Sequence, residues 1–324
     1  MGYPPCRPHR SRHRRHGRIF RGWRFKLSDL KSESERQIPA NAIAFLLAFA
    51  ALCAPSIALA RASYAAPQML HIARLDVAAW LPEKRTSAAG PVIIFSHGFH
   101  GCNTQSTFLT AALARSGYAV FAPNHRDAAC RNLAAWFTRP EVPFRQAKDW
   151  SDNTYADRAR DITRLLDAFS ADPRYHSFDW QHVGVVGHSL GGYTALQLGG
   201  ASASLKDRRV KAVLALSPYA EPFVVHKTLA AIDAPVMYQG GTRDFGITPF
   251  IISSGGAYDQ TPAPKYFVEF DGAGHFAWTD MRATYHDAIV DYARGFFDHW
   301  LRGKPFPSSL SAAHGDVTVV KIEP

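Results

Sequence analysis

Cysteine is scarce in this chain, and the patterns that would indicate several other classes of protein are missing. Only 4 of the 324 residues are cysteine. No set of Cys, His, Asp or Glu has the spacing of a metal site, and no motif for a cofactor is present. There is also no heptad stretch and no internal repeat. We therefore expect neither a bound metal nor a cofactor, and neither a coiled coil nor a solenoid.

Most of the chain has almost no excess of basic over acidic residues, although the formal net charge is +10. Residues 1–60 hold 11 Lys and Arg against 3 Asp and Glu, whereas residues 61–324 hold 26 against 24. The basic character therefore belongs to the N-terminal segment alone. We infer no surface for nucleic acid in the remainder, and no nucleic-acid partner.

The first 60 residues have the composition of a targeting leader. Residues 7–36 are basic, and residues 42–60 are almost continuously apolar and uncharged, ending in Ala58-Leu59-Ala60. Small residues in this spacing are typical of a signal peptidase site. We expect an exported protein, periplasmic or secreted. The alternative is a membrane anchor formed by residues 42–60, which would be the chain's contact with a membrane.

Apolar runs and amphipathic segments alternate in the rest of the chain. Strands are predicted near residues 91–95, 118–122, 183–186, 210–216, 235–239 and 266–270, and helices near residues 106–116, 155–169, 192–198 and 281–301. Residues 70–81 are predicted as an early strand or hairpin, and residues 128–153 as an excursion over the edge of the core. Alternation of this kind predicts an α/β fold with a mostly parallel sheet and helices on both faces.

The predicted domain organisation is simple. Residues 1–60 form the leader, residues 67–305 form a single domain, and residues 306–324 form a C-terminal tail. Within that tail, residues 317–322 have the pattern of a short edge strand.

A nucleophile motif follows the strand predicted at residues 183–186. The sequence Gly187-His188-Ser189-Leu190-Gly191 fits G-x-S-x-G, and a helix is predicted directly after it. The turn between strand and helix is so tight that the two flanking positions need glycine. This context predicts that Ser189 is exposed above the sheet as a nucleophile.

The partners of such a serine follow it in the order acid, then histidine. Asp244 comes just after the strand predicted at 235–239, and His275 lies between glycines and Phe276 after the last predicted strand. Asp271, Asp280 and Asp233 are rival acids. Asp271 is too close in sequence to orient His275 easily, and Asp233 precedes its strand. Asp244 is therefore expected to hold the imidazole, and His275 to act as general base.

A second loop carries the donors that acyl transfer needs. The sequence Ser96-His97-Gly98-Phe99-His100-Gly101 follows an earlier strand. A developing oxyanion needs two preorganised N–H groups, and we assign them to the backbone of Phe99 and Leu190. His97 and His100 could serve as bases or metal ligands. The simpler interpretation is that they pack the loop and bond to backbone.

The chain resembles the α/β-hydrolase superfamily. It is similar to the bacterial branch that groups dienelactone-hydrolase-like proteins with platelet-activating-factor-acetylhydrolase-like esterases. The resemblance rests on Phe95-Ser96-His97-Gly98-Phe99, Gly117-Tyr118-Ala119-Val120-Phe121-Ala122-Pro123-Asn124-His125, Val186-Gly187-His188-Ser189-Leu190-Gly191-Gly192, Gly241-Thr242-Arg243-Asp244 and Gly274-His275-Phe276. Dienelactone hydrolases use a cysteine nucleophile, whereas this chain has Ser189. The resemblance therefore implies an α/β-hydrolase fold and a serine hydrolase acting on a carboxylic ester of an alcohol.

Cys102 and Cys130 remain once the leader is set aside. An even pair in an exported protein favours a disulfide. Each cysteine lies in a loop after one of two predicted strands, and such loops leave a parallel sheet at the same edge. The alternative is two unpaired thiols that pack as small apolar groups.

The substrate is only coarsely defined by the sequence. We expect a small-molecule ester, hydrolysed without a cofactor. Trp278 and Tyr219 either line an acyl or alcohol pocket or pack in the core, and Arg126 and Arg243 are candidate contacts for an anion. A serine peptidase or amidase is a second interpretation, because the same triad cleaves both bond types. A catalytically silent binding protein on a hydrolase scaffold is a third.

Overall fold

A computed structural model describes residues 65–83, 90–131 and 133–324. The predicted leader, with its signal sequence or anchor, lies outside these residues. The described residues belong to one unit that spans residues 63–324. In this part of the chain, no helix is both long enough and apolar enough to cross a membrane.

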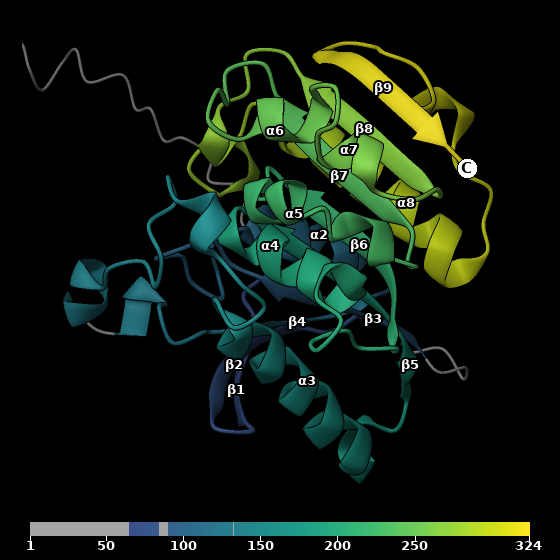
Figure 1. Cartoon of the computed structure of the whole chain (residues 1–324). Helices are drawn as coiled ribbons and strands as arrows, with labels where there is room; N and C mark the ends of the chain where they lie inside the picture. The colour runs from purple at the N-terminus through teal and green to yellow at the C-terminus, as the bar shows by residue number, and fades with distance from the viewer. Residues whose placement is uncertain (1–64, 84–89, 132) are drawn as a thin grey trace, which may run out of the picture. The chain divides into compact units, whose positions relative to one another are not determined.

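The described residues form one sheet of nine strands, in the order β1-β2-β4-β3-β5-β6-β7-β8-β9 (Figure 1). The six central strands are parallel, whereas β1, β2 and β9 pair antiparallel to their neighbours. The mostly parallel α/β fold predicted from the sequence is therefore confirmed. The strands are β1 Gln68–Ile72, β2 Leu75–Trp80, β3 Gly90–Ser96, β4 Ala119–Pro123, β5 Phe178–His188, β6 Val210–Leu216, β7 Val236–Gly241, β8 Lys265–Phe270 and β9 Val317–Glu323.

Helices cover both faces of this sheet, and each face has its own apolar core. Helices α3 and α4 pack on one face, and α2 and α8 pack on the other. Figure 1 shows α3, α4 and α5 in front of the sheet. The helices are α2 Thr107–Arg115, α3 Ala156–Ala171, α4 Leu190–Leu196, α5 Glu221–His226, α6 Thr248–Ile252, α7 Ala257–Gln260 and α8 His286–Arg302.

The local sequence accounts for the two-sided burial. Strand β3 runs through Val92, Ile93, Ile94 and Phe95, all without solvent exposure, as expected of a parallel strand covered on both faces. Helix α3 is amphipathic, and its apolar stripe is buried against the sheet. A continuous apolar run therefore predicts a central strand, and a stripe of period 3.6 predicts a covering helix.

The structure departs from the predicted elements near the C-terminus. The last helix begins at His286 instead of near residue 281. The segment before it turns back, and the Asp280 carboxylate accepts hydrogen bonds from the backbone N–H groups of Thr107 and Phe108, at 3.0 Å each. Asp280 thus satisfies free donors at the start of α2, a tertiary contact that no local pattern reveals. Strand β9 lies in the expected tail and supplies the edge of the sheet next to β8.

Loops that follow the parallel strands gather at one edge of the sheet. The loops after β3 and β4 are joined there by a disulfide between Cys102 and Cys130, whose Cα atoms are 5.9 Å apart. The same loops share a backbone hydrogen bond from Ala129 N–H to the Gly101 carbonyl, at 3.2 Å. The loop after β3 is therefore tied to its neighbour at two points.

We expect Cys102 and Cys130 to contain no free thiol in protein purified from an oxidising compartment. The bond closes a loop of 28 residues, and constraint of the unfolded chain should raise the free energy of unfolding by about 3 kcal/mol. Thiol titration of denatured, unreduced protein tests the pairing, and urea unfolding with and without reductant tests the stability. Two titratable thiols at these positions would contradict the prediction.

Candidate active site

Ser189 occupies a strained turn between β5 and α4. Its backbone has φ 55° and ψ −117°, a conformation that residues other than glycine rarely adopt. A Cβ on Gly187 would lie 2.1 Å from the Gly191 carbonyl oxygen, and one on Gly191 would lie 1.9 Å from that of Ser96. Only glycine fits at these two positions, so the motif is required by the crossing of three backbone segments.

A chain of hydrogen bonds connects the three residues that the sequence places in a triad. His275 Nε2 lies 2.9 Å from Ser189 Oγ, and His275 Nδ1 lies 3.2 Å from Asp244 Oδ2. The Asp244 side chain is 4% exposed and that of His275 is 28% exposed. A carboxylate accepts a hydrogen bond from Nδ1–H, which leaves Nε2 unprotonated and able to take the proton of the serine hydroxyl.

Contact between two loops sets the distance from Asp244 to His275. Strand β7 ends at Gly241, and a Cβ there would lie 2.3 Å from the Ala273 carbonyl oxygen. The same carbonyl accepts a hydrogen bond from Arg243 N–H at 3.0 Å. The loop that carries the acid is therefore bonded directly to the loop that carries the base.

Ser217, at the end of β6, joins this cluster although the sequence analysis did not identify it. Its hydroxyl donates to Asp244 Oδ2, and its Oγ also lies 2.9 Å from His275 Nδ1. The side chain is fully buried. A polar residue directly after the strand next to β5 was the available signal, since that strand ends at the edge where the site lies.

The three rival acids are engaged elsewhere. Asp271 accepts a hydrogen bond from the Thr242 hydroxyl at 3.0 Å. Asp233 pairs with Lys206 on the surface, and Asp280 caps α2. None of these contacts involves the His275 ring, so the geometry favours Asp244 as its partner.

The loop after β3 lies directly against the serine. A Cβ on Gly98 would lie 3.4 Å from Ser189 Cβ and 3.2 Å from His188 Nδ1. Neither Phe99 N–H nor Leu190 N–H donates to another group of the described chain. Two free amide donors beside a nucleophile are what an oxyanion site requires.

His97 and His100 contact backbone, as the simpler interpretation predicts. His97 accepts from His125 N–H through Nε2 at 3.1 Å and donates from Nδ1 to the Gly98 carbonyl at 2.7 Å. Burial and the nearby Arg158 charge lower the pKa of His97 well below its ordinary value, so the ring is neutral. The His100 ring bonds to the Thr138 carbonyl at 2.9 Å.

A partly buried relay connects the loop after β3 to the backbone of His275. Gly98 N–H donates to Gln105 Oε1 at 2.9 Å, and Gln105 Nε2 donates to His188 Nδ1 at 3.0 Å. His188 Nε2 then donates to the His275 carbonyl at 2.8 Å. Burial, followed by the neighbouring His275, lowers the pKa of His188 to about 3. The neutral ring can therefore accept at one nitrogen and donate at the other.

The aromatic and basic side chains proposed as substrate contacts mostly have structural roles. Trp278 is fully buried and donates to Gln239 Oε1 at 3.0 Å. Tyr219 is 4% exposed and donates to the Phe144 carbonyl. Of the two arginines, Arg126 is paired with Glu141 and Asp157. The core interpretation therefore holds for both aromatic residues.

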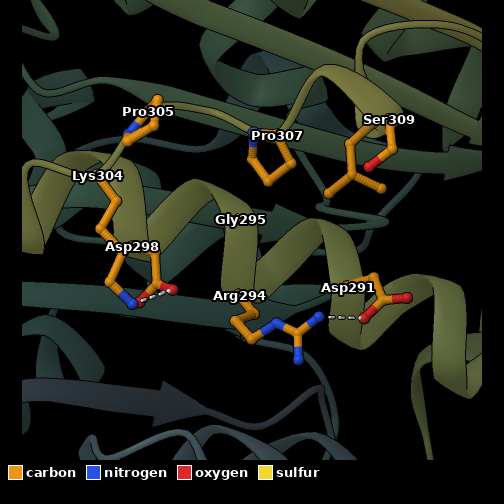
Figure 2. Close-up of a pocket in the computed structure, with 9 residues that line it drawn as sticks. Asp291, Arg294, Gly295, Asp298, Lys304, Pro305, Pro307 and Ser309 are labelled. Atoms are coloured by element: carbon orange, nitrogen blue, oxygen red, sulfur yellow. Dashed lines mark hydrogen bonds and ion pairs between the residues drawn. The ribbon is translucent and has the colours of Figure 1, made fainter.

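A surface pocket of about 300 Å³ lies elsewhere, between α8 and the segment 304–310 (Figure 2). Its charged side chains are paired with one another, Arg294 with Asp291 and Lys304 with Asp298. Ser309 lines this pocket, but no histidine is among its lining residues. In the described ranges, no three His, Cys, Asp or Glu side chains converge as metal ligands. The cluster at Ser189 therefore remains the candidate active site.

The chain is similar to one protein family and to several individual proteins. The model of the dienelactone hydrolase family matches residues 77–300, which include every residue of the cluster. The chain is 26% identical to a platelet-activating factor acetylhydrolase of Bos taurus over 197 residues, covering 51% of this chain and 43% of that protein. It is 24% identical to cutinase est2 of Thermobifida alba over 216 residues, covering 66% and 62% respectively.

Among solved structures, an acylaminoacyl peptidase of Pyrococcus horikoshii superposes with a TM-score of 0.54 at 15% identity. The match covers 74% of this chain and 42% of that one. At this identity the likeness concerns the fold alone. The chain spans less than half the length of the matched acetylhydrolase and peptidase.

We expect His188 to make stability depend on pH. Between about pH 6.5 and 3 the unfolded ring is protonated and the folded ring is not. The unfolded state then binds more protons, so the free energy of unfolding falls as the pH falls through this window. The contribution of the neutral His188 to that free energy is complete above the window. His188→Gln should remove up to about 1.4 kcal/mol per pH unit from that slope.

Urea unfolding at several pH values between about 4.5 and 7.5 measures the slope. The matched control is His176→Gln, at an exposed histidine, which should leave the slope unchanged. If His188→Gln and wild type lost stability in parallel on acidification, the buried neutral state of His188 would be wrong.

Proposed function

We propose that this chain, which belongs to the dienelactone hydrolase family, is a serine hydrolase that cleaves carboxylic esters through an acyl-enzyme on Ser189. The family assignment, with its ester-hydrolysing relatives, makes the chain a hydrolase of this type. The ester substrate, the triad and the covalent intermediate are our proposal.

One observation carries the proposal, namely the hydrogen-bonded chain from Ser189 through His275 to Asp244. It begins at the turn between β5 and α4, which we call the elbow. Its order along the sequence is serine, acid, histidine, as on other α/β-hydrolase sheets. Each member has the partner that its role requires, since the base contacts the nucleophile and the acid contacts the base.

The mechanism follows from these contacts. Ser189 Oγ attacks the ester carbonyl carbon while His275 Nε2 takes its proton, and Asp244 stabilises the imidazolium that forms. The carbonyl oxygen becomes an oxyanion and is held by the N–H groups of Phe99 and Leu190. His275 returns the proton to the departing alcohol. Water then attacks the acyl group by the same route and regenerates the serine.

The choice of an ester rests on the relatives and on the surface near the triad. The sequence relatives reported above are an acetylhydrolase and a cutinase, both named for ester hydrolysis. Phe245, which follows the acid, is 78% exposed, and Phe276, which follows the base, is 55% exposed. Exposed aromatic side chains beside a site suit a substrate with apolar substituents. We therefore favour an uncharged ester of moderate size.

We also propose that the protein works outside the cytoplasm. The disulfide between Cys102 and Cys130 supports this, because such bonds persist in oxidising compartments. If the leader is cleaved after Ala60, N-terminal sequencing of the exported protein should begin at Arg61. An intact leader in a membrane fraction would favour the anchor instead.

Substitution of the triad should abolish hydrolysis of a short-chain activated ester. Ser189→Ala and His275→Ala should each lower kcat by about 10⁴-fold or more, and the double variant should lose little beyond either one, because the residues act as a unit. Circular dichroism should show that the variants fold. A fluorophosphonate probe should label wild type and leave Ser189→Ala unlabelled.

The substrate panel should pair each ester with its matching amide. Ester turnover with little amide turnover supports the proposal, whereas equal or faster amide cleavage would make the chain an amidase or peptidase. Activity of Ser189→Ala within about tenfold of wild type would exclude this serine as nucleophile. Absence of both labelling and turnover in wild type would favour a silent binding protein.

A further inference from the structure

A buried arginine lies behind the oxyanion loop and takes no part in the mechanism above. Arg158 belongs to α3, and its side chain is fully buried. Its guanidinium donates two bonds to Asp127, from Nε to Oδ1 and from Nη2 to Oδ2, both at 3.0 Å. Burial alone would raise the pKa of Asp127, but the charge and hydrogen bonds of Arg158 lower it far below its ordinary value. The pair is therefore ionised.

The same guanidinium holds two successive carbonyls of the loop. Nη1 donates to the His97 carbonyl at 2.8 Å, and Nη2 donates to the Gly98 carbonyl at 3.2 Å. The Gly98 carbonyl also accepts from His97 Nδ1 at 2.7 Å and from Gly101 N–H at 2.9 Å. The arginine thus connects the loop to α3 and, through Asp127, to the loop after β4.

The orientation of this carbonyl decides where the next N–H points. The Gly98–Phe99 peptide is trans, since the described residues have one cis bond, at Ala263–Pro264. In a trans peptide the C=O and N–H point in opposite directions. Because the Gly98 carbonyl faces Arg158, Phe99 N–H faces away from it. A Cβ on Gly98 would lie 3.4 Å from Ser189 Cβ, so this peptide lies beside Ser189.

We propose that Arg158 is a positioning residue for the oxyanion site, holding the Gly98–Phe99 peptide so that Phe99 N–H faces the carbonyl oxygen of the bound ester. The inference rests on the proposed function. Arginine suits the task because its planar fork can bond both oxygens of a carboxylate and two carbonyls at once, four bonds in all, whereas lysine has three donors. The turn bond from Gly101 shapes the loop internally, whereas Arg158 ties the loop to the core.

The decisive variant removes both charges of the pair. The single substitution Arg158→Gln would leave the Asp127 carboxylate buried without its partner. Combining it with Asp127→Asn avoids this unpaired charge. We expect kcat/KM for the ester to fall by about 10- to 100-fold, because an oxyanion donor displaced by a fraction of an ångström loses much of its effect. The affinity for a boronic acid, which forms a tetrahedral adduct on Ser189 Oγ, should fall by the same factor. The affinity for a planar amide analogue should change less than about threefold.

The chain offers a matched control on the other side of α3. Arg209 and Asp207 form a second bidentate pair, with Nε–Oδ1 at 2.9 Å and Nη2–Oδ2 at 2.6 Å, and Arg209 also contacts the Thr163 carbonyl in α3. Arg209→Gln with Asp207→Asn should lower Tm but leave kcat/KM and boronate affinity within about threefold of wild type.

Backbone NMR observes the peptide directly and does not depend on catalysis. The sequence has two Gly-Phe bonds, Gly98–Phe99 and Gly295–Phe296. Protein labelled with ¹³C-carbonyl glycine and ¹⁵N-phenylalanine therefore gives two carbonyl-to-amide correlations. Loss of Arg158 should move the Gly98–Phe99 signal and leave the Gly295–Phe296 signal in α8 unchanged.

A folded double variant with wild-type boronate affinity, or an unmoved Gly98–Phe99 signal, would overturn the proposal. Equal weakening of boronate and amide binding would also overturn it, because it would indicate general loosening of the site. If the double variant does not fold, Arg158→Lys is measured, with selective loss of boronate affinity expected and equal loss contrary. Failure of wild type to hydrolyse any ester would refute the proposed function, and the NMR result would still report on the peptide.

Discussion

The close crossing of three backbone segments at the elbow is the constraint on which the rest of the site depends. The end of β3, the end of β5 and the start of α4 approach so closely that Gly191 faces the Ser96 carbonyl with no room for a side chain. This crossing holds Ser189 in a strained backbone conformation, and the surrounding hydrogen bonds keep it in place. Because Ser96 leads directly into the next loop, the same crossing also brings Gly98 against Ser189.

Around this point, several polar groups are linked in series by hydrogen bonds, while the N–H groups of Phe99 and Leu190 have no acceptor within the described chain. The relay from Gly98 through Gln105 and His188 reaches the backbone of His275 without using a net charge. Neutral groups avoid the large cost of burying an ion, and full satisfaction avoids the cost of an orphaned donor. Ser189 thus contacts His275 directly, and the loop that carries Phe99 is connected to the backbone of His275 through the relay.

The sequence predicts the fold, and it identifies three residues that the structure brings together, because both depend on local signals. Apolar runs identify the strands, and Ser189, Asp244 and His275 each follow a strand whose end is recognisable. Ser217, Gln105 and Arg158 escape such reasoning, since each depends on at least one partner that is 27 or more residues away. The late start of α8 has the same origin, as Asp280 is drawn to α2 by a contact across 172 residues. Exposure also could not be inferred from residue type. The sequence therefore left open whether Trp278 lines a pocket or packs in the core, where the structure has it.

The sheet sets the order in which the residues of the site stand. Ser189, Ser217, Asp244 and His275 follow β5, β6, β7 and β8, which are four neighbouring strands. Strands in a sheet are spaced by their backbone hydrogen bonds, about 4.8 Å apart whatever their side chains. The strands therefore fix the order in which these residues stand, and the loop from Asp271 to His275 brings the imidazole back to Ser189, so that Nε2 lies 2.9 Å from Oγ. A change in the length of that loop would move the imidazole away from Ser189 even if every strand kept its place.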